Sequence, residues 1–371
     1  MFPRAFSLRH SGSSAASVKR WHHSHRIGRH FHAAPPTATN QRGAHGEDAS
    51  RGGGHGPRWR AQQSKQPWQQ PPLRLTALAA AAAFVSTATP IAEPGSTGAS
   101  SPFRLVSGVS YRPDPGKANK AGEDAHFVSD DGLAVGVADG VGGWSDSGVD
   151  AGVYARLLMS QAASALQEPI DSVVKLLGAE LAKTVPEPLR VMLLAHSRTI
   201  VRGSSTACVV LLRGNELQVA NLGDSGFAIL RDGRLLFKSP PQQHRFNFPY
   251  QIGAYRGGDS PLDAQNFRAD VKLGDVLIVA TDGLWDNVFM EEVTSIVSTA
   301  LRAGRSPGDA AQELVNLAHE RGHSKTARTP FSVEAMRNRV VFVGGKLDDT
   351  TVIVSVVKEA PHVAPPSTPP R

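Results

Sequence analysis

Three acidic residues of this chain, Asp139, Asp224 and Asp282, each stand at the end of an apolar run. An apolar run that closes in an acid beside glycine predicts a buried strand that delivers one carboxylate to a loop at its end. Carboxylates that meet at neighbouring strand ends repel one another and lose water, so such a cluster is tolerated mainly when cations neutralise it. Because the donors are oxygen atoms, without His or Cys, the pattern favours Mg2+ or Mn2+ over Zn2+.

A predicted hairpin brings two more acids to Asp139. The strand-like runs 125–128 and 133–138 flank an Asp-Asp-Gly turn, which is typical of a β-hairpin. Glu123 and Asp124 directly precede the first run, and Asp139 directly follows the second. Since an antiparallel hairpin places these two ends side by side, we expect the three carboxylates to be neighbours.

The order of the remaining elements predicts an α+β fold. Strands, helices, strands, helices and a final strand do not alternate as in a doubly wound parallel sheet, so we expect mostly antiparallel β-sheets flanked by helices. We predict a strand at 103–111, helices at 151–166, 170–183 and 188–200, turns at 214–215 and 231–234, a strand at 276–281, helices at 290–303 and 307–321, and a last strand at 350–357.

The basic character of the chain is concentrated in its first hundred residues. Residues 1–100 hold 12 Lys and Arg against 3 Asp and Glu, whereas the remainder holds 28 against 30. Residues 1–72 are rich in Arg, Ser, His, Gly and Gln, which is typical of an organelle transit segment or a disordered arm. The composition suits a mitochondrion and a chloroplast alike. A nucleic-acid-binding arm is the competing interpretation, but no basic motif interleaved with aromatic residues supports it, so we expect no nucleic-acid partner.

Composition divides the chain into three predicted parts. Residues 90–102 are dominated by Pro, Gly, Ser and Thr, which is typical of a linker. We therefore expect a disordered basic N-terminal region with a transit segment and linker at 1–101, a folded domain at 102–359, and a disordered Pro-rich tail at 360–371.

The segment 73–85 is the candidate for membrane contact, and 77–85 is its uninterrupted apolar run. This run falls well short of the ~20 apolar residues that cross a bilayer, so we expect a processed presequence rather than a transmembrane helix.

Cys208 is the one cysteine, so the chain has no intrachain disulfide. A nucleophilic cysteine of the tyrosine-phosphatase kind needs an arginine six positions later, where Gly214 stands. We interpret Cys208 as a small buried residue of a strand.

Six motifs follow one another along residues 104–357. They are Gly-Glu-Asp-Ala at 122–125, Val-Ala-Asp-Gly-Val-Gly-Gly-Trp at 137–144, Gly-Ser-Ser-Thr-Ala at 203–207, Asn-Leu-Gly-Asp-Ser-Gly at 221–226, Thr-Asp-Gly-Leu-Trp-Asp-Asn at 281–287 and Gly-Gly-Lys-Leu-Asp-Asp-Thr-Thr at 344–351. A single Asp-Gly is common in turns, but six motifs in this order are specific, and they resemble those of the metal-dependent type 2C protein serine/threonine phosphatases, the PPM class. The segment 137–144 and Gln242-Gln243-His244 resemble the organelle-directed branch of that class.

The resemblance implies a sandwich of two antiparallel sheets flanked by helices, with a two-metal site at one sheet edge. It also implies the roles of individual residues, of which Asp139, Asp282 and Asp348 are the catalytic ones. Asp139 matches the acid that bridges two Mg2+ or Mn2+ ions, and the carbonyl of Gly140 matches a backbone ligand. Asp282 and Asp348 match the other ligands of one ion, and Glu123 matches a ligand of the second ion through water. Asp124 matches an acceptor that orients metal-bound water, and Asp224 matches a position for a weak third ion.

The chemistry implied by the resemblance is direct hydrolysis of phosphoserine and phosphothreonine in proteins. A water that bridges two cations ~4 Å apart would attack phosphorus in line with the leaving group, without a phosphoenzyme. Phosphorylated proteins are then the expected partners, together with an organelle import machinery that reads the N-terminal region.

Two positions depart from the pattern of this class. Val141 stands where many relatives have a His that serves as general acid, which leaves metal-bound water, His126 or His244 as candidates. Asn119 stands where relatives often have an arginine that holds phosphate, so Lys117 or Lys120 is the tentative replacement, as a point charge without a bidentate fork. The departures leave open an alternative function, a non-catalytic module that binds phosphoproteins in the same pocket.

Overall fold

The computed structural model describes residues 101–117, 121–254 and 258–361. The predicted transit segment, Lys120 and the end of the Pro-rich tail lie outside these residues, so the domain boundaries stay predictions. In the part of the chain that the structure describes, none of the helices combines the length and the apolar character that crossing a membrane requires.

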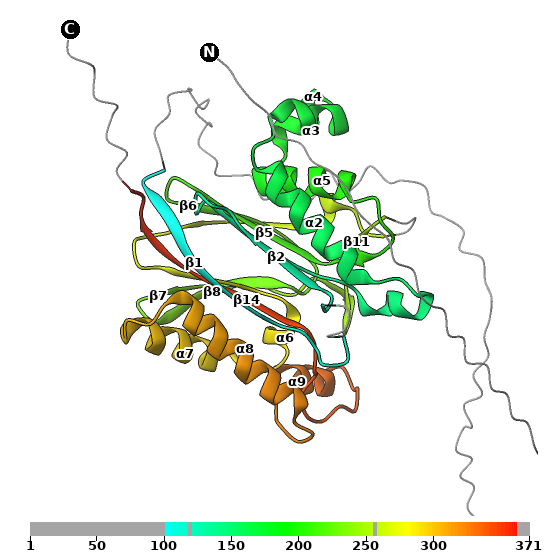
Figure 1. Cartoon of the computed structure of the whole chain (residues 1–371), viewed down its shortest axis with the longest axis vertical. Coiled ribbons are helices and arrows are strands. Elements are labelled where there is room, and N and C mark those ends of the chain that lie inside the picture. Colours follow the sequence, from blue (N-terminus) through cyan, green and yellow to red (C-terminus); the bar gives the residue numbers. More distant parts are fainter. Residues whose placement is uncertain (1–100, 118–120, 255–257, 362–371) are drawn as a thin grey trace, which may run out of the picture. The chain divides into compact units, whose positions relative to one another are not determined.

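The first of two five-stranded antiparallel sheets has the strand order β1-β14-β13-β7-β8 (Figure 1). The first and last strands of the domain pair along their whole length, so the two ends of the domain close one sheet. The strands are β1 Phe103–Arg112, β14 Thr350–Glu359, β13 Val276–Ala280, β7 Gly226–Arg231 and β8 Arg234–Lys238.

The second sheet has the strand order β12-β6-β5-β3-β2 and is also antiparallel throughout. The hairpin expected around residues 130–132 is present as β2 and β3. The strands are β12 Gln265–Asp270, β6 Glu216–Leu222, β5 Ala207–Arg213, β3 Ala134–Asp139 and β2 Asp124–Val128.

The side chains of β3 point alternately into two apolar clusters, one of which lies between the two sheets. Val135 and Val137 belong to the apolar cluster between the sheets, whereas Ala134 and Ala138 belong to the cluster beneath the helices. Successive side chains of a strand point to opposite faces, so a strand that is buried on both faces becomes a continuous apolar run. The unbroken hydrophobicity of this strand therefore reflects two apolar environments.

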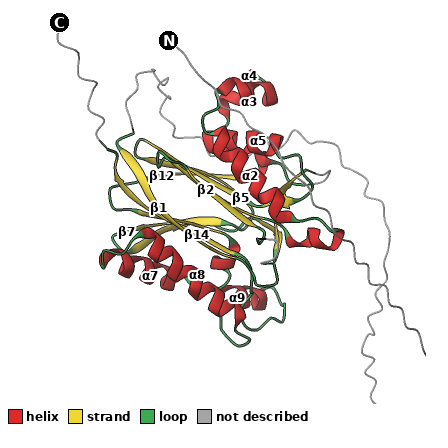
Figure 2. Ribbon diagram, viewed as in Figure 1, coloured by secondary structure: helices red, strands yellow, loops and turns green. Residues whose placement is uncertain are grey.

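Helices cover the outer face of each sheet, so the strands lie between two helical layers (Figure 2). Against the second sheet lie α2 Ala151–Ala165 and α5 Glu187–Arg198, with α3 Ile170–Leu177 and α4 Ala179–Thr184 beyond them. Against the first lie α6 Asp282–Trp285, α7 Met290–Arg302 and α8 Pro307–His323. Ser306 caps α8 in a capping box with Asp309.

The predicted fold class is confirmed, and several elements differ from the prediction. The single helix expected at 170–183 is two helices, because Gly178 adopts a φ of 81° between α3 and α4. The strand β12 and the helix α9 Pro330–Arg337 were not predicted. The side chains of β12 are half-buried or exposed throughout, so its sequence carries little apolar signal.

Candidate active site

The acids of the hairpin meet the ends of β13 and β14 at one end of the sandwich. β2 and β3 pair so that Asp124 lies opposite Asp139, which confirms the predicted neighbourhood. Oδ2 of Asp124 accepts hydrogen bonds of 2.8 Å from the hydroxyls of both Thr281 and Thr351. Thr281 directly follows β13 and Thr351 is the second residue of β14, so a buried acid of one sheet is hydrogen-bonded to the strand ends of the other.

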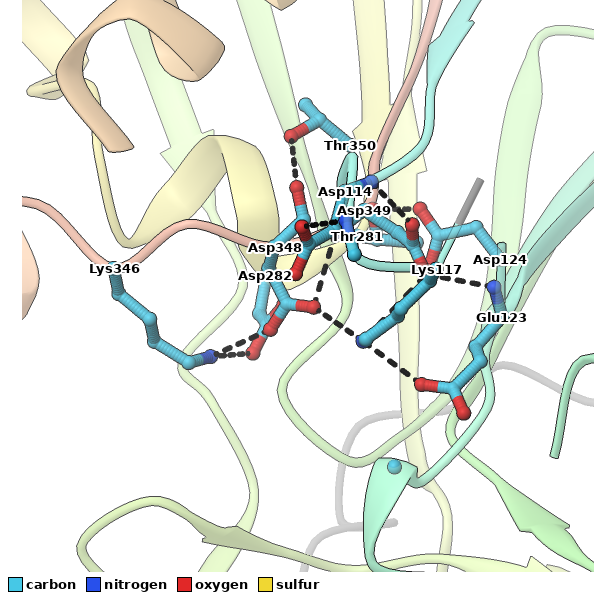
Figure 3. A network of polar contacts seen from close by, with 12 residues as sticks. Asp114, Lys117, Glu123, Asp124, Thr281, Asp282, Lys346, Asp348, Asp349 and Thr350 are labelled. Atoms are coloured by element: carbon cyan, nitrogen blue, oxygen red, sulfur yellow. Dashed lines mark hydrogen bonds and ion pairs between the residues drawn. The ribbon is translucent and has the colours of Figure 1, made fainter. Parts of the chain in front are cut away.

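Asp282 and Asp348 reach the same place because they are chain neighbours of this junction. Asp282 begins α6 directly after Thr281, and Asp348 lies two residues before β14. The ammonium group of Lys346 connects them (Figure 3). It contacts Oδ2 of Asp282 and lies 2.8 Å from Oδ2 of Asp286 and 3.3 Å from Oδ2 of Asp348.

A second ammonium group, that of Lys117, lies on the other side of Asp348 (Figure 3). Its Nζ is 2.9 Å from Oδ1 of Asp348, 2.8 Å from Oε2 of Glu123 and 3.6 Å from Oδ2 of Asp349. Each carboxylate oxygen of Asp348 therefore has a different lysine as its partner.

Asp349 positions the backbone that carries Glu123. Its carboxylate is 1 % exposed as a side chain. Oδ2 accepts a hydrogen bond of 2.6 Å from the Glu123 amide, and Oδ1 accepts one of 2.7 Å from the Asp114 amide. A carboxylate that accepts backbone N–H groups fixes the loops that donate them, so Asp349 orients the loop before β2 toward the other acids.

Gly140 is a position where backbone comes too close for any side chain. A Cβ there would lie 2.7 Å from the Ala151 carbonyl oxygen and 2.8 Å from that of Glu123. The Gly140 amide donates a hydrogen bond of 3.0 Å to the same Glu123 oxygen. The Asp-Gly pair therefore lets the loop after β3 pack directly against the segment that carries Glu123 and against the start of α2.

Burial and like charges govern the protonation of the cluster. Burial raises the pKa of Asp139 well above its usual range, and the Asp282 carboxylate raises it further. Burial also raises the pKa of Asp124, with a contribution from Asp349. Burial opposes ionisation of Asp348 too, but Lys346 and Lys117 outweigh it and hold that pKa below its usual value. The two lysines thus stabilise the charge of Asp348 and leave Asp139 uncompensated.

Asp224 belongs to the same electrostatic unit. Burial, with the Asp282 carboxylate, raises its pKa to about 7. Its Oδ2 accepts a hydrogen bond of 2.9 Å from Nε2 of Gln243, which lies in the short strand β9 Gln243–Arg245. Asp224 thus lies within electrostatic reach of the acids described above and is held by an amide rather than by a cation.

The donor set fits a hard divalent cation. Two buried carboxylate oxygens, Oδ1 of Asp124 and Oδ1 of Asp282, have no hydrogen-bond partner among the described residues. Unpaired carboxylate oxygens in a buried, acid-rich site are costly without a cation. Within the same residues, no three His, Cys, Asp or Glu side chains converge closely enough to hold an ion as they stand in this structure. Lys346 and Lys117 contact carboxylates of this cluster, so they compete with a cation for those oxygens.

The remaining sequence-predicted residues are placed as follows. Lys117 contacts acids rather than an open phosphate position. His244 lies 2.9 Å from Oδ1 of Asp259 and stacks on Tyr250. No hydrogen bond joins His126 or His244 to the acidic cluster in the described ranges.

Sequence reasoning missed the roles of Lys346 and Asp286. Both belong to the motifs quoted above, but nothing in their spacing shows that a lysine after Gly-Gly folds back onto three carboxylates. Burial raises the pKa of Asp286 to about 6, against the opposing effect of Lys346. Asn287 supplies the reason for the fold-back, since its side chain donates to the Lys346 carbonyl at 2.7 Å and accepts from the Lys346 amide at 3.0 Å.

Comparison with known proteins is consistent with this geometry. Residues 117–318 match the family model described as Protein phosphatase 2C. The chain is 45% identical over 255 residues to Probable protein phosphatase 2C 80 of Arabidopsis thaliana, across 69% of this chain and 59% of that protein. It is 47% identical over 257 residues to Probable protein phosphatase 2C 55 of the same plant, across 69% of this chain and 52% of that protein. The chain thus spans between half and three fifths of the length of these relatives.

A solved structure shares the fold. The X-ray structure of the photosystem II phosphatase PBCP is 32% identical to this chain and superposes with a TM-score of 0.61, over 68% of this chain and 99% of that one. The arrangement of two sheets between helices is thus seen in a phosphatase at an appreciable sequence identity.

Proposed function

The chain belongs to the protein phosphatase 2C family, and on that premise we propose that it removes phosphate from phosphoserine and phosphothreonine of proteins with the help of Mg2+ or Mn2+. One observation carries the proposal. Acids from four separate segments, represented by Glu123, Asp139, Asp282 and Asp348, are gathered at one end of the sandwich, and their charge exceeds what two lysines neutralise. A buried excess of carboxylates is the requirement for binding hard divalent cations.

Some of these residues would bind cations, and others fix the loops that carry the cation-binding residues. Asp139, Asp282 and Asp348 present the oxygen donors, with Glu123 at their side, the Gly140 carbonyl on the backbone and Asp224 at a weaker position. Asp124 and Asp349 are already hydrogen-bonded to threonines and to backbone amides, so they fix loops. A pair of bound divalent cations supplies an activated water and neutralises charge on the phosphoryl oxygens.

Hydrolysis would be direct, by water, because the hydroxyls of Thr281 and Thr351 already donate to Asp124 and the thiol of Cys208 is not available. Cys208 is fully buried in β5, and burial raises the pKa of its thiol well above the usual range. A buried thiol with a raised pKa is inert toward a phosphoryl group. An attacking water thus accounts for the reaction without a phosphorylated intermediate.

We also propose delivery to an organelle, either mitochondrion or chloroplast, through recognition of the N-terminal region by the import machinery. The support is the Arg- and Ser-rich composition of residues 1–72 with few acids. A fluorescent protein fused after residue 100 should accumulate in one of these organelles, and diffuse fluorescence throughout the cell would contradict the proposal.

The test of the activity compares two phosphopeptides of the same sequence with Mn2+ present. The wild-type chain should release phosphate from the phosphothreonine peptide at least 100-fold faster than the Asp139→Asn variant does. It should also release phosphate faster from this peptide than from the phosphotyrosine peptide. Equal rates for wild type and Asp139→Asn, with Mn2+ bound, would contradict the proposal.

A second candidate is a non-catalytic module that binds phosphoproteins. The observation in its favour is that Lys117 and Lys346 occupy the carboxylates that cations would need. If this is correct, calorimetry should detect binding of the phosphothreonine peptide while no phosphate is released at any Mn2+ concentration.

A further inference from the structure

A cavity of about 480 Å3 opens beside the acidic cluster, and we call it the side pocket. Its walls come from the end of β8, the segment 239–246, the start of α7 and the helix α9. Asp224 and Asp286 line it, and Asp286 is bonded to the same Lys346 ammonium that contacts Asp282. The side pocket therefore begins one side chain away from the carboxylates proposed to hold metal.

Aromatic rings line this cavity. Trp285, Phe246, Phe289 and Phe331 all contribute to its lining. The rings of Phe246 and Phe331 are 5.0 Å apart between centroids. Lys346 Nζ lies 5.4 Å from the centroid of the Phe331 ring. Phe331 thus connects the apolar part of the side pocket to the lysine that contacts the acids.

Two cations in the side pocket lack an acidic partner. Lys238 Nζ lies 4.9 Å from the centroid of the Trp285 ring, and the Arg328 guanidinium lies 5.2 Å from that of Phe289. Among the described residues, no carboxylate lies within ion-pair distance of either side chain. Burial lowers the pKa of Lys238, the Asp286 carboxylate opposes that effect in part, and an incoming anion would oppose it further.

The acids of the side pocket do not cancel these two cations. Asp286 pairs with Lys346, and Glu334 pairs with Arg337 at 3.1 Å. Asp224 accepts from Gln243 and belongs to the acidic cluster. Glu291 is the acid left at the exposed rim. The side pocket therefore combines aromatic surface with two cations that can accept a negatively charged guest.

We propose that the side pocket binds the part of a phosphoprotein substrate next to the phosphorylated residue, with a bulky apolar side chain against Trp285 and Phe331 and an acidic side chain against Lys238 and Arg328. This inference rests on the proposed function, and it names the substrate class, phosphorylated segments that are both acidic and apolar. The cavity can hold one large side chain, and its shared wall with the acids places such a side chain within one or two residues of the phosphate.

The first experiment fills the side pocket. Val333 lines it from α9, and Met336 lies on the same helix, is 77 % exposed and does not line it. We expect Val333→Trp to lower kcat/KM at least tenfold for a phosphothreonine peptide that carries Leu and Glu next to the phosphate. The control Met336→Trp should stay within twofold of wild type. For each variant, kcat/KM for the peptide is divided by kcat/KM for p-nitrophenyl phosphate in the same preparation. This ratio corrects for the fraction of active protein.

The second experiment removes the cations. The double variant Lys238→Gln/Arg328→Gln should lose at least fivefold in the same ratio for the Leu and Glu peptide. It should lose less than twofold for a peptide with Leu and Gln, which lacks the acid. Arg234→Gln is the control, since Arg234 lies on the same strand as Lys238 but outside the side pocket.

A binding measurement separates this inference from the proposed function. Fluorescence anisotropy of the labelled peptides gives Kd without turnover. If wild-type protein hydrolyses neither the phosphothreonine peptide nor p-nitrophenyl phosphate, the proposed function fails, while the ranking of peptides by Kd still decides the role of the side pocket. The inference would be overturned if the peptide with Leu and Glu and a peptide with Ala and Gln had equal Kd values. It would also be overturned if Val333→Trp and Met336→Trp had equal effects on kcat/KM.

Discussion

The ammonium group of Lys346 lies 3.3 Å from Oδ2 of Asp348, and it shares its charge with Asp282 and Asp286. Burial opposes the charged form of Lys346, but the three carboxylates outweigh it and hold its pKa well above the usual range. A lysine held in this way is a permanent cation, so it stabilises the acids and competes with any divalent ion for them.

Replacing Lys346 by Met should therefore strengthen metal binding. We expect the Kd for Mn2+ to fall at least tenfold, about 1.4 kcal/mol, while the thermal midpoint of the metal-free protein falls because the acids lose a counter-charge. Calorimetry and thermal unfolding with EDTA measure the two effects. Lys325→Met is the matched control at an exposed position. An unchanged Kd for Mn2+ would show that Lys346 does not compete.

Asp139→Asn should separate metal binding from folding. Burial and the Asp282 carboxylate raise the pKa of Asp139, so a neutral isostere relieves repulsion. We expect the metal-free protein to unfold at a higher temperature than wild type, and Mn2+ to raise that temperature less. A variant that unfolds at a lower temperature without metal would contradict the proposed repulsion.

Gly140→Ala should disturb the loop between Glu123 and α2. The added Cβ would lie 2.7 Å and 2.8 Å from two carbonyl oxygens, so the loop must shift. We expect a loss of about 2 kcal/mol in the free energy of unfolding, within the range for overpacking, together with weaker Mn2+ binding. Urea titration measures the first, and Gly143→Ala is the control, since no atom lies within 4 Å of a Cβ there. Equal stability of the two variants would show that the close contact is unimportant.

Thr351→Val should destabilise the junction between the sheets. Oδ2 of Asp124 would lose one of its two hydroxyl donors, and a buried acceptor that loses a donor costs about 1–3 kcal/mol. We expect that loss in urea titration of the metal-free protein. The double variant with Thr281→Val should lose more than the sum of the single effects if the two hydroxyls can replace one another.

The stability of the protein should depend on pH through His196. Burial lowers the pKa of His196, whose Nδ1 lies 3.0 Å from the Tyr154 hydroxyl. The pKa of His in the unfolded chain is ~6.5. Below that pH the unfolded chain binds a proton more readily than the folded protein does, so the folded protein loses stability as the pH falls below ~6.5 and keeps it above. The difference in unfolding free energy between wild type and His196→Gln should shrink from pH 7.5 to 5.5. A difference that stays constant over this range would contradict the direction of the shift.

The sequence predicted those parts of the fold and site that depend on local patterns. Apolar runs that end in Asp-Gly identified β3 and β13, and the hairpin placed Asp124 beside Asp139. Register across the sheets could not be predicted, because it depends on pairing between distant strands such as β1 and β14. The pairing of β13 with β14 places Thr281 beside Thr351, and the packing of one sheet on the other brings both to Asp124.

The role of Lys346 and the side pocket lay beyond sequence reasoning for a related reason. Both depend on α9 and the segment after it, whose apolar residues Val340, Val341 and Val343 remain exposed and so give a misleading pattern. The fold-back of Lys346 follows from hydrogen bonds to Asn287, 59 residues away in the chain.

The central claim is that acids from distant segments are gathered here to hold divalent cations, and titration of the metal-free full chain with Mn2+ tests it most directly. Calorimetry should detect about two ions per chain for wild type and fewer for Asp139→Asn and for Asp282→Asn. Absence of Mn2+ binding by the wild type, or binding that neither substitution changes, would contradict the account.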